Sequence, residues 1–308
     1  MRLNGIHHIS AITADARRNL DFYTRVLGLR LVKKTVNQDD PTAYHLFYAD
    51  EHGSPGADLT FFEYPGAARG RAGAGMIHRI VSRVGARDAL VFWNARLRTE
   101  GIAARWEGEG LHFEDPDGLG HELRVSTSDD APLVAAHPGI PTEFALRGFD
   151  GVRAYARDPE RSRRFLDEAV GFRRDGGDGF EARGATRGAT YAYDRASEMG
   201  RSGSGTVHHV AWASTMDEHA AWRERVVRGG GHPTPIIDRF YFRSIYFREP
   251  SGVLFEIATM GPGFAVDEPL AHLGESLSLP PAFEPLRAQL ERTLTPLPNP
   301  RPSLPTGP

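Results

Sequence analysis

The chain has 308 residues, enough for two domains of ordinary size or for one domain with extensions. Its 37 basic and 40 acidic residues leave a net charge of −3, which excludes a nucleic-acid partner bound by bulk positive charge. The absence of cysteine excludes disulfides, cysteine-ligated zinc, iron–sulfur clusters and a cysteine nucleophile.

The N-terminal segment carries no apolar stretch of the kind found in secretory signals. No run of residues approaches the roughly 18–20 apolar residues that a membrane span needs. We therefore expect a cytoplasmic protein with no membrane partner.

Four copies of one structural module are predicted along the chain. The first module has a strand at 5–13, a helix at 14–27 and three strands at 29–36, 44–49 and 58–63, in the order β-α-β-β-β. The same order restarts three times, with first strands at 76–84, near 151 and at 206–214, and with helices at 88–99, 160–170 and 216–228. The second and fourth modules close on matching hairpins, FEDPDG and FREPSG, each followed by a glutamate six residues after the proline. The match indicates internal duplication.

The modules are grouped into two halves by a change in composition. We predict an N-terminal domain at 1–130, a polar, proline-containing linker at 131–146 and a C-terminal domain at 147–261. Residues 262–308 form a tail with one short amphipathic helix at 282–294 and a proline-rich, extended end.

Two histidine pairs, His7-His8 and His208-His209, lie in the predicted first strands of modules one and four. Because neighbouring side chains of a strand face opposite sides, only one histidine of each pair is expected on the concave face, His8 and His209. Glu256 lies in the apolar strand VLFEIAT, where a buried carboxylate is costly unless a metal or an arginine neutralises it. Two imidazoles and one carboxylate form the facial triad that suits non-haem Fe(II), so we predict a metal site at His8, His209 and Glu256.

Modules two and three serve as an internal comparison. The second module has Arg79 in place of the predicted histidine ligand, and the third has Val152-Arg153 with no histidine. Glu122, the counterpart of Glu256, is therefore expected to pair with Arg79. One metal site per chain follows, and modules one and four must meet in space to form it.

The four βαβββ modules and the motifs GIHHIS, VHHVAWA and VLFEI resemble the glyoxalase/bleomycin resistance/dioxygenase superfamily, also called the vicinal oxygen chelate superfamily. The segments KKTVN, YHLFYADEHGSPGADLTFF and DRFYFRSIYFREPSGVLFE resemble its hydroquinone-type ring-cleaving dioxygenases, those like 2,6-dichlorohydroquinone 1,2-dioxygenase. The resemblance covers nearly the whole chain. It implies an α+β fold in which the four modules form two cupped, partly open β-barrels with helices outside.

By this resemblance the activity is an Fe(II)-dependent, extradiol-type ring cleavage that inserts O2 into a hydroquinone or catechol-like aromatic, as in aromatic compound degradation. Fe(II) is the expected cofactor, with Mn(II) as the alternative ion and O2 as co-substrate. The metal ligands of the family again fall on His8, His209 and Glu256. The expected partners are a small aromatic substrate and, as an open alternative, further copies of the chain in a homo-oligomer.

The catalytic residues that the resemblance implies around the metal are His7, Ser10, His208, Arg239 and Tyr246. Tyr246 is expected to hydrogen-bond the substrate oxygen, Arg239 to offset negative charge on oxygen, and the two histidines to transfer protons. Strand alternation points both histidines away from the metal unless a β-bulge turns them. Eight other histidines, His45 among them, lie in predicted hairpins, linkers or helices and are assigned no role.

Two other functions stay open. A glyoxalase-like metal-dependent isomerase or lyase would use the same fold with a fourth protein ligand, but residues 59–62 offer no evident histidine or glutamate for that position. A metal-free small-molecule-binding protein of the resistance type would not need the triad.

Overall fold

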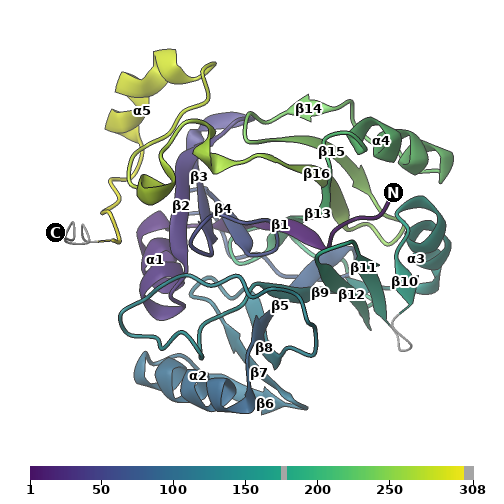
Figure 1. The fold of residues 1–308 in the computed structure, drawn as a ribbon, viewed down its shortest axis with the longest axis horizontal. Coiled ribbons are helices and arrows are strands. Elements are labelled where there is room, and N and C mark those ends of the chain that lie inside the picture. Colours follow the sequence, from purple (N-terminus) through teal and green to yellow (C-terminus); the bar gives the residue numbers. More distant parts are fainter. Residues whose placement is uncertain (175–178, 302–308) are drawn as a thin grey trace.

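The fold consists of two sheets surrounded by helices. The computed structural model describes residues 1–174 and 179–301 of the chain. The strands form two eight-stranded sheets with the orders β14-β15-β16-β13-β1-β4-β3-β2 and β10-β11-β12-β9-β5-β8-β7-β6. The helices lie around the outside of the sheets (Figure 1). The predicted α+β architecture of four βαβββ modules is confirmed.

Each sheet combines one module from each half of the chain. The first sheet holds the strands of modules one and four: β1 (Ile6–Thr13), β2 (Arg30–Asn37), β3 (Asp40–Ala49), β4 (Asp58–Glu63), β13 (Val207–Ser214), β14 (Ile237–Asp238), β15 (Phe242–Arg248) and β16 (Leu254–Pro262). The second holds modules two and three: β5 (Met76–Val84), β6 (Ala104–Glu107), β7 (Gly110–Glu114), β8 (Gly120–Val125), β9 (Phe149–Ala156), β10 (Arg173–Arg174), β11 (Gly179–Arg183) and β12 (Gly188–Arg195). The predicted domains at 1–130 and 147–261 therefore do not coincide with the two sheets, and their boundaries stay a prediction.

One helical segment follows the first strand of every module. These segments are α1 (Ala16–Asp21) continued by a π-helix (Phe22–Val26), α2 (Arg87–Thr99), α3 (Glu160–Arg164) continued by a π-helix (Phe165–Ala169), and α4 (His219–Arg228). The side chain of Asp15 accepts hydrogen bonds from the first free N–H groups of α1, which starts the helix there. Gly28, with φ +71°, takes up the left-handed conformation just after this first helical segment. The segment predicted at 216–228 begins three residues later, at His219, because residues 216–218 form a turn.

The tail folds against the first sheet and is held there by a buried lysine. It contains three 3₁₀ turns (Phe264–Val266, Leu270–His272 and Glu284–Leu286) and α5 (Arg287–Thr293), which is shorter than the helix predicted at 282–294. Lys33 of β2 is fully buried and forms ion pairs with Asp267, at 2.7 Å, and with Glu268. Of the predicted extended end, residues 302–308 lie outside the described residues. No helix in the described ranges is long and apolar enough to cross a membrane.

The centre of the first sheet is where modules one and four meet. Strand β1 pairs antiparallel with β13, and β13 pairs in parallel with β16. Strands from opposite ends of the chain therefore lie side by side, as the single predicted metal site requires. A small apolar cluster that includes Phe47, Ala211, Phe242 and Ala258 packs on the same face of this sheet as the predicted ligands.

Candidate metal centre

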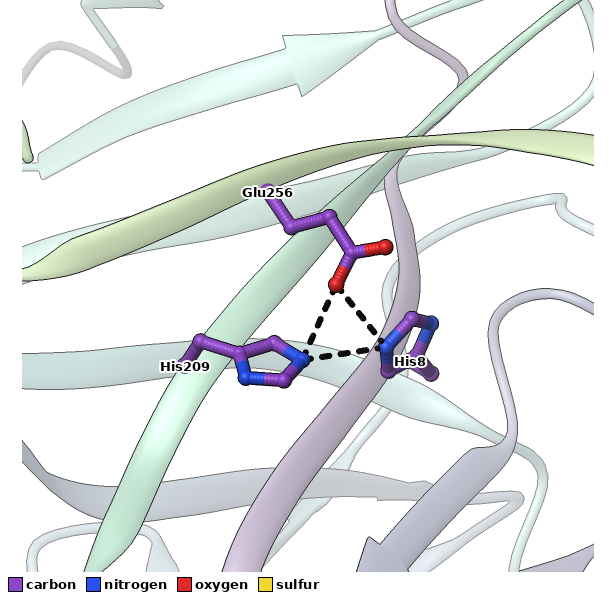
Figure 2. A group of neighbouring side chains, drawn as sticks. All are labelled: His8, His209 and Glu256. Carbon is purple, nitrogen blue, oxygen red and sulfur yellow. Dashed lines mark hydrogen bonds and ion pairs between the residues drawn. The ribbon is translucent and has the colours of Figure 1, made fainter. Parts of the chain in front are cut away.

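Three side chains from the centre of the first sheet meet at one point (Figure 2). His8 comes from β1, His209 from β13 and Glu256 from β16. The Nε2 atoms of the two imidazoles are 3.2 Å apart. Oε2 of Glu256 lies 3.3 Å from Nε2 of His8 and 2.9 Å from Nε2 of His209. The structure thus brings together the three residues that the sequence pattern singled out.

The chemistry and spacing of these three atoms fit a metal ion. All three residues are buried, and Glu256 is 0% exposed. Its Oε1 accepts a hydrogen bond from Ser244 Oγ at 2.5 Å, whereas Oε2 has no hydrogen-bond partner in the described part of the chain. A buried oxygen without such a bond calls for another partner. Neighbouring ligands of one ion, at right angles with bonds of about 2.1 Å, would lie about 3.0 Å apart, and the observed separations are 2.9 to 3.3 Å.

Three protein ligands would leave coordination positions on a bound metal ion free for other molecules. Within the described part of the chain, the cluster of potential ligands contains His8, His209 and Glu256 and no fourth residue. A set of two histidines and one carboxylate leaves coordination positions open on an octahedral ion. Among the described residues, the cluster therefore lacks the fourth protein ligand that a glyoxalase-like site would have.

The protonation states of the cluster suit metal binding. Burial alone would raise the pKa of the Glu256 carboxyl, but the imidazoles of His8 and His209 hold that pKa well below its usual range. Burial lowers the pKa of His209, although the neighbouring carboxylate opposes the effect. An ionised carboxylate and a neutral imidazole are the forms that coordinate metal ions.

Both histidine pairs lie at β-bulges. The register between β1 and β13 shifts by one residue at His7 and again at His208. A bulge interrupts the alternation of side chains and re-aims the extra residue. Nδ1 of His7 lies 3.0 Å from Nδ1 of His8, and Nδ1 of His208 lies 2.8 Å from Nδ1 of His209. A β-bulge was the condition on which either histidine was expected to turn toward the site, and the structure has one at each pair. The catalytic roles of His7 and His208 stay a prediction.

His7 determines which nitrogen of His8 carries the proton. The carbonyl oxygen of Thr259 can only accept a hydrogen bond, so Nε2 of His7, 3.1 Å away, is the donor. Burial lowers the pKa of His7 to about 3, so its ring is neutral and its Nδ1 accepts a hydrogen bond from Nδ1–H of His8. The lone pair of His8 is then on Nε2, the atom that faces His209 and Glu256.

A cavity of about 310 Å³ opens on the cluster. Its walls come from both modules of the first sheet and include the rings of Phe47, Phe62, Tyr241 and Phe242. Its volume is near the lower end of the range for small-molecule sites. The cavity is therefore suited to one aromatic ring with small substituents.

Two of the predicted catalytic residues line this cavity together. The guanidinium of Arg239 lies 5.5 Å from the centre of the Tyr246 ring and donates two hydrogen bonds to Asp39, at 3.0 and 2.9 Å. Burial and the nearby Glu256 raise the pKa of Tyr246, so its hydroxyl stays protonated and can donate a hydrogen bond. His208 also lines the cavity.

Two of the predicted catalytic residues, Ser10 and His7, do not line the cavity. The hydroxyl of Ser10 lies 2.7 Å from the hydroxyl of Thr60. Thr60 in turn lies 2.9 Å from Nε2 of His45, which does line the cavity. His45 was assigned no role from the sequence, because its position at the cavity depends on the register that pairs it with Phe62 of β4. Only that register could have signalled its position.

The second sheet carries no equivalent cluster within the described residues. Glu122 lies 3.5 Å from Arg79 and 2.6 Å from Arg124, so the predicted pairing with Arg79 is confirmed. A larger cavity, of about 530 Å³, lies beside this sheet. Most of its charged residues form ion pairs, as Arg83 does with Asp150 at 3.2 Å.

Three comparisons place these features among known proteins. The model of the Glyoxalase/Bleomycin resistance protein/Dioxygenase superfamily matches residues 5–123 and 148–257. A Bacillus subtilis protein named as a ring-cleaving dioxygenase, MhqA, is 41% identical over 318 residues, which cover 96% of this chain and 100% of that protein. A chlorohydroquinone/hydroquinone 1,2-dioxygenase of Sphingobium indicum is 34% identical and covers 95% of this chain and 96% of its own length.

Solved structures show the same fold. The crystal structure of a Bacillus subtilis protein described as a dioxygenase superposes with a TM-score of 0.89 at 36% identity and covers 97% of this chain and 98% of its own. Glyoxalase I of Zea mays superposes with a TM-score of 0.56 at 17% identity and covers 83% of this chain and 92% of its own. At 17% identity, the similarity to glyoxalase I is evidence of a shared fold alone.

Proposed function

Because the chain belongs to the glyoxalase/bleomycin resistance protein/dioxygenase superfamily, we propose that it is a ring-cleaving dioxygenase with a non-haem Fe(II) site. The proposed substrate is a hydroquinone or catechol-like aromatic, and the proposed ligands are His8, His209 and Glu256. The observation that carries the proposal is this buried cluster at an aromatic-walled cavity. Relatives that match over nearly the whole chain and bear dioxygenase names support it.

The metal would supply the redox chemistry of the reaction. Fe(II), or Mn(II) as the alternative, would bind O2 and would lower the pKa of a coordinating ring hydroxyl when held by these three ligands. Both atoms of O2 enter the product as one carbon–carbon bond of the ring breaks. The protein contributes orientation and electrostatics.

The cavity residues have three proposed roles. Aromatic walls hold the ring flat and exclude water. The protonated hydroxyl of Tyr246 donates a hydrogen bond to a substrate oxygen, and Arg239 beside it offsets negative charge there. His208 lines the cavity next to His209, so its imidazole is placed to accept a proton from the substrate hydroxyl.

Oxygen uptake tests the proposed reaction directly. The protein is loaded with Fe(II) without oxygen and then mixed with a panel of hydroquinones and catechols in air-saturated buffer. We expect one O2 to be consumed for each ring opened. If no dihydroxylated aromatic causes oxygen uptake, the proposed function is wrong.

Metal content tests the proposed ligands separately from activity. The His209→Ala variant should retain almost no Fe(II) after gel filtration, because it loses one of three ligands. Glu122→Gln is the matched control, since Glu122 has the same place in the second module but pairs with arginines. It should bind as much metal as the unmodified protein, and a loss of metal there would contradict the assignment of one site per chain.

A further inference from the structure

We propose that His45 contacts the substrate and hydrogen-bonds a second ring hydroxyl, remote from the one at the metal ligands. The inference rests on the proposed function and deepens it, because it names the group that recognises the far side of the ring. His45 lies on β3, two strands beyond β1 in the order β13-β1-β4-β3. It therefore belongs to a different wall of the cavity from His8 and His209.

The imidazole of His45 is held in a fixed plane. Its ring centre lies 4.0 Å from that of Phe47 and 4.2 Å from that of Phe62, with interplanar angles of 40° and 35°. Phe47 is the second residue along the same strand, and Phe62 is the cross-strand partner on β4. Two aromatic neighbours on one imidazole restrict its rotation, as a recognition group requires.

One ring nitrogen of His45 lies within hydrogen-bonding distance of a described side chain, and the other does not. Nε2 lies 2.9 Å from the hydroxyl of Thr60, which lies 2.7 Å from the hydroxyl of Ser10. Thr60 and Ser10 are both 0% exposed, so this contact is shielded from water. Nδ1 of His45 forms no hydrogen bond with any residue in the described ranges. A ligand in the cavity is the partner that this nitrogen lacks.

The electrostatics of His45 suit a neutral hydroxyl. Burial lowers the pKa of His45 well below its usual value, so the ring carries no charge. The ring centre of Phe62 lies 4.2 Å from that of His45 and 6.5 Å from that of His209. Because β3 is the second strand beyond β1, the oxygen that meets His45 is proposed to be a different one from the oxygen bound near His209. A hydroquinone carries its second hydroxyl on the opposite side of the ring, whereas a catechol carries it next to the first.

Binding without oxygen separates recognition from turnover. Calorimetry on the Fe(II)-loaded, oxygen-free protein measures Kd for hydroquinone and for phenol, which lacks the second hydroxyl. The His45→Leu variant should bind hydroquinone about tenfold more weakly, as expected for one lost hydrogen bond in a buried site. Its Kd for phenol should stay within about twofold. His52→Leu, which removes an exposed histidine, is the matched control and should change neither value.

Two further variants guard against a purely structural effect. His45→Gln keeps a hydrogen-bonding group and should recover part of the hydroquinone affinity. Thr60→Val keeps the shape of the buried side chain and removes its contacts to Nε2 of His45 and to the hydroxyl of Ser10. It should therefore weaken the binding of hydroquinone selectively and by a smaller factor.

The outcomes distinguish this inference from the function on which it rests. Equal losses for hydroquinone and phenol in His45→Leu, or no loss for hydroquinone, would overturn the role of His45 and leave the dioxygenase proposal standing. If the unmodified protein binds neither compound, the proposed function fails and the inference fails with it.

Discussion

Replacing Lys33 by methionine should destabilise the protein strongly through the tail. The side chain of Lys33 is 0% exposed and is surrounded by Asp267 at 2.7 Å, by Glu268 and by the carbonyl oxygen of Phe264 at 3.1 Å. The substitution keeps the volume but leaves two carboxylates, 19% and 10% exposed, without their cation. Breaking a buried ion pair by removing one partner costs about 3–5 kcal/mol. Since both carboxylates keep some contact with water, we expect the lower end, about 3 kcal/mol.

Urea unfolding measures this loss, and the neighbouring lysine provides the control. Lys34 is 8% exposed, and the one hydrogen bond that its Nζ donates to a described residue goes to the carbonyl oxygen of Glu275, at 3.2 Å. Lys34→Met should therefore cost no more than about 1 kcal/mol. If the two substitutions destabilise the protein equally, the ion pairs are not what anchors the tail.

The same cluster also supports the cavity. Nζ of Lys33 lies 4.9 Å from the centre of the Tyr241 ring, and the hydroxyl of Tyr241 donates to Asp267 at 2.9 Å. Tyr241 lines the cavity. Combining Lys33→Met with Asp267→Asn and Glu268→Gln removes the unpaired charges and should recover part of the lost stability. No recovery would contradict the electrostatic explanation.

Three shorter predictions concern pH, specificity and metal affinity. Burial lowers the pKa of His121 to about 3, below the 6.5 of an unfolded histidine, so the folded state binds fewer protons in this interval and stability falls as pH falls. His121→Phe should remove about 2 kcal/mol of the loss between pH 7 and pH 5 in urea unfolding, and an unchanged slope would refute this. Asp39→Asn frees Arg239 from its ion pair, so calorimetry should show a carboxylated hydroquinone binding about tenfold more tightly; unchanged affinity would count against Asp39 as a determinant of specificity. Ser244→Ala removes the hydrogen bond to Oε1 of Glu256 and should weaken Fe(II) binding about 10- to 100-fold in a chelator competition, whereas an unchanged Kd would show that this bond does not orient the ligand.

Local patterns in the sequence were sufficient for the architecture and for the choice of the candidate ligands that the structure brings together. The strand–helix order of each module depends on side-chain periodicity and on helix-ending glycines such as Gly28, which act within a few residues. The absence of cysteine limited the ligands to imidazole and carboxylate, and the repeated hairpin singled out Glu256 over the rest of its strand. The contrast with Arg79 in the second module indicated one site rather than two.

Contacts between distant strands decided the rest of the site. The bulges at His7 and His208 arise from the register of β1 against β13, about 200 positions apart in the chain, and they overturned the strict alternation expected for a regular strand. His45 lies beside Phe62 because β3 pairs with β4. Asp39 pairs with Arg239 because modules one and four meet in the first sheet. Periodicity within a strand determines which residues share a face, but not which strand lies next to it, because pairing and register depend on cross-strand contacts that no local pattern contains.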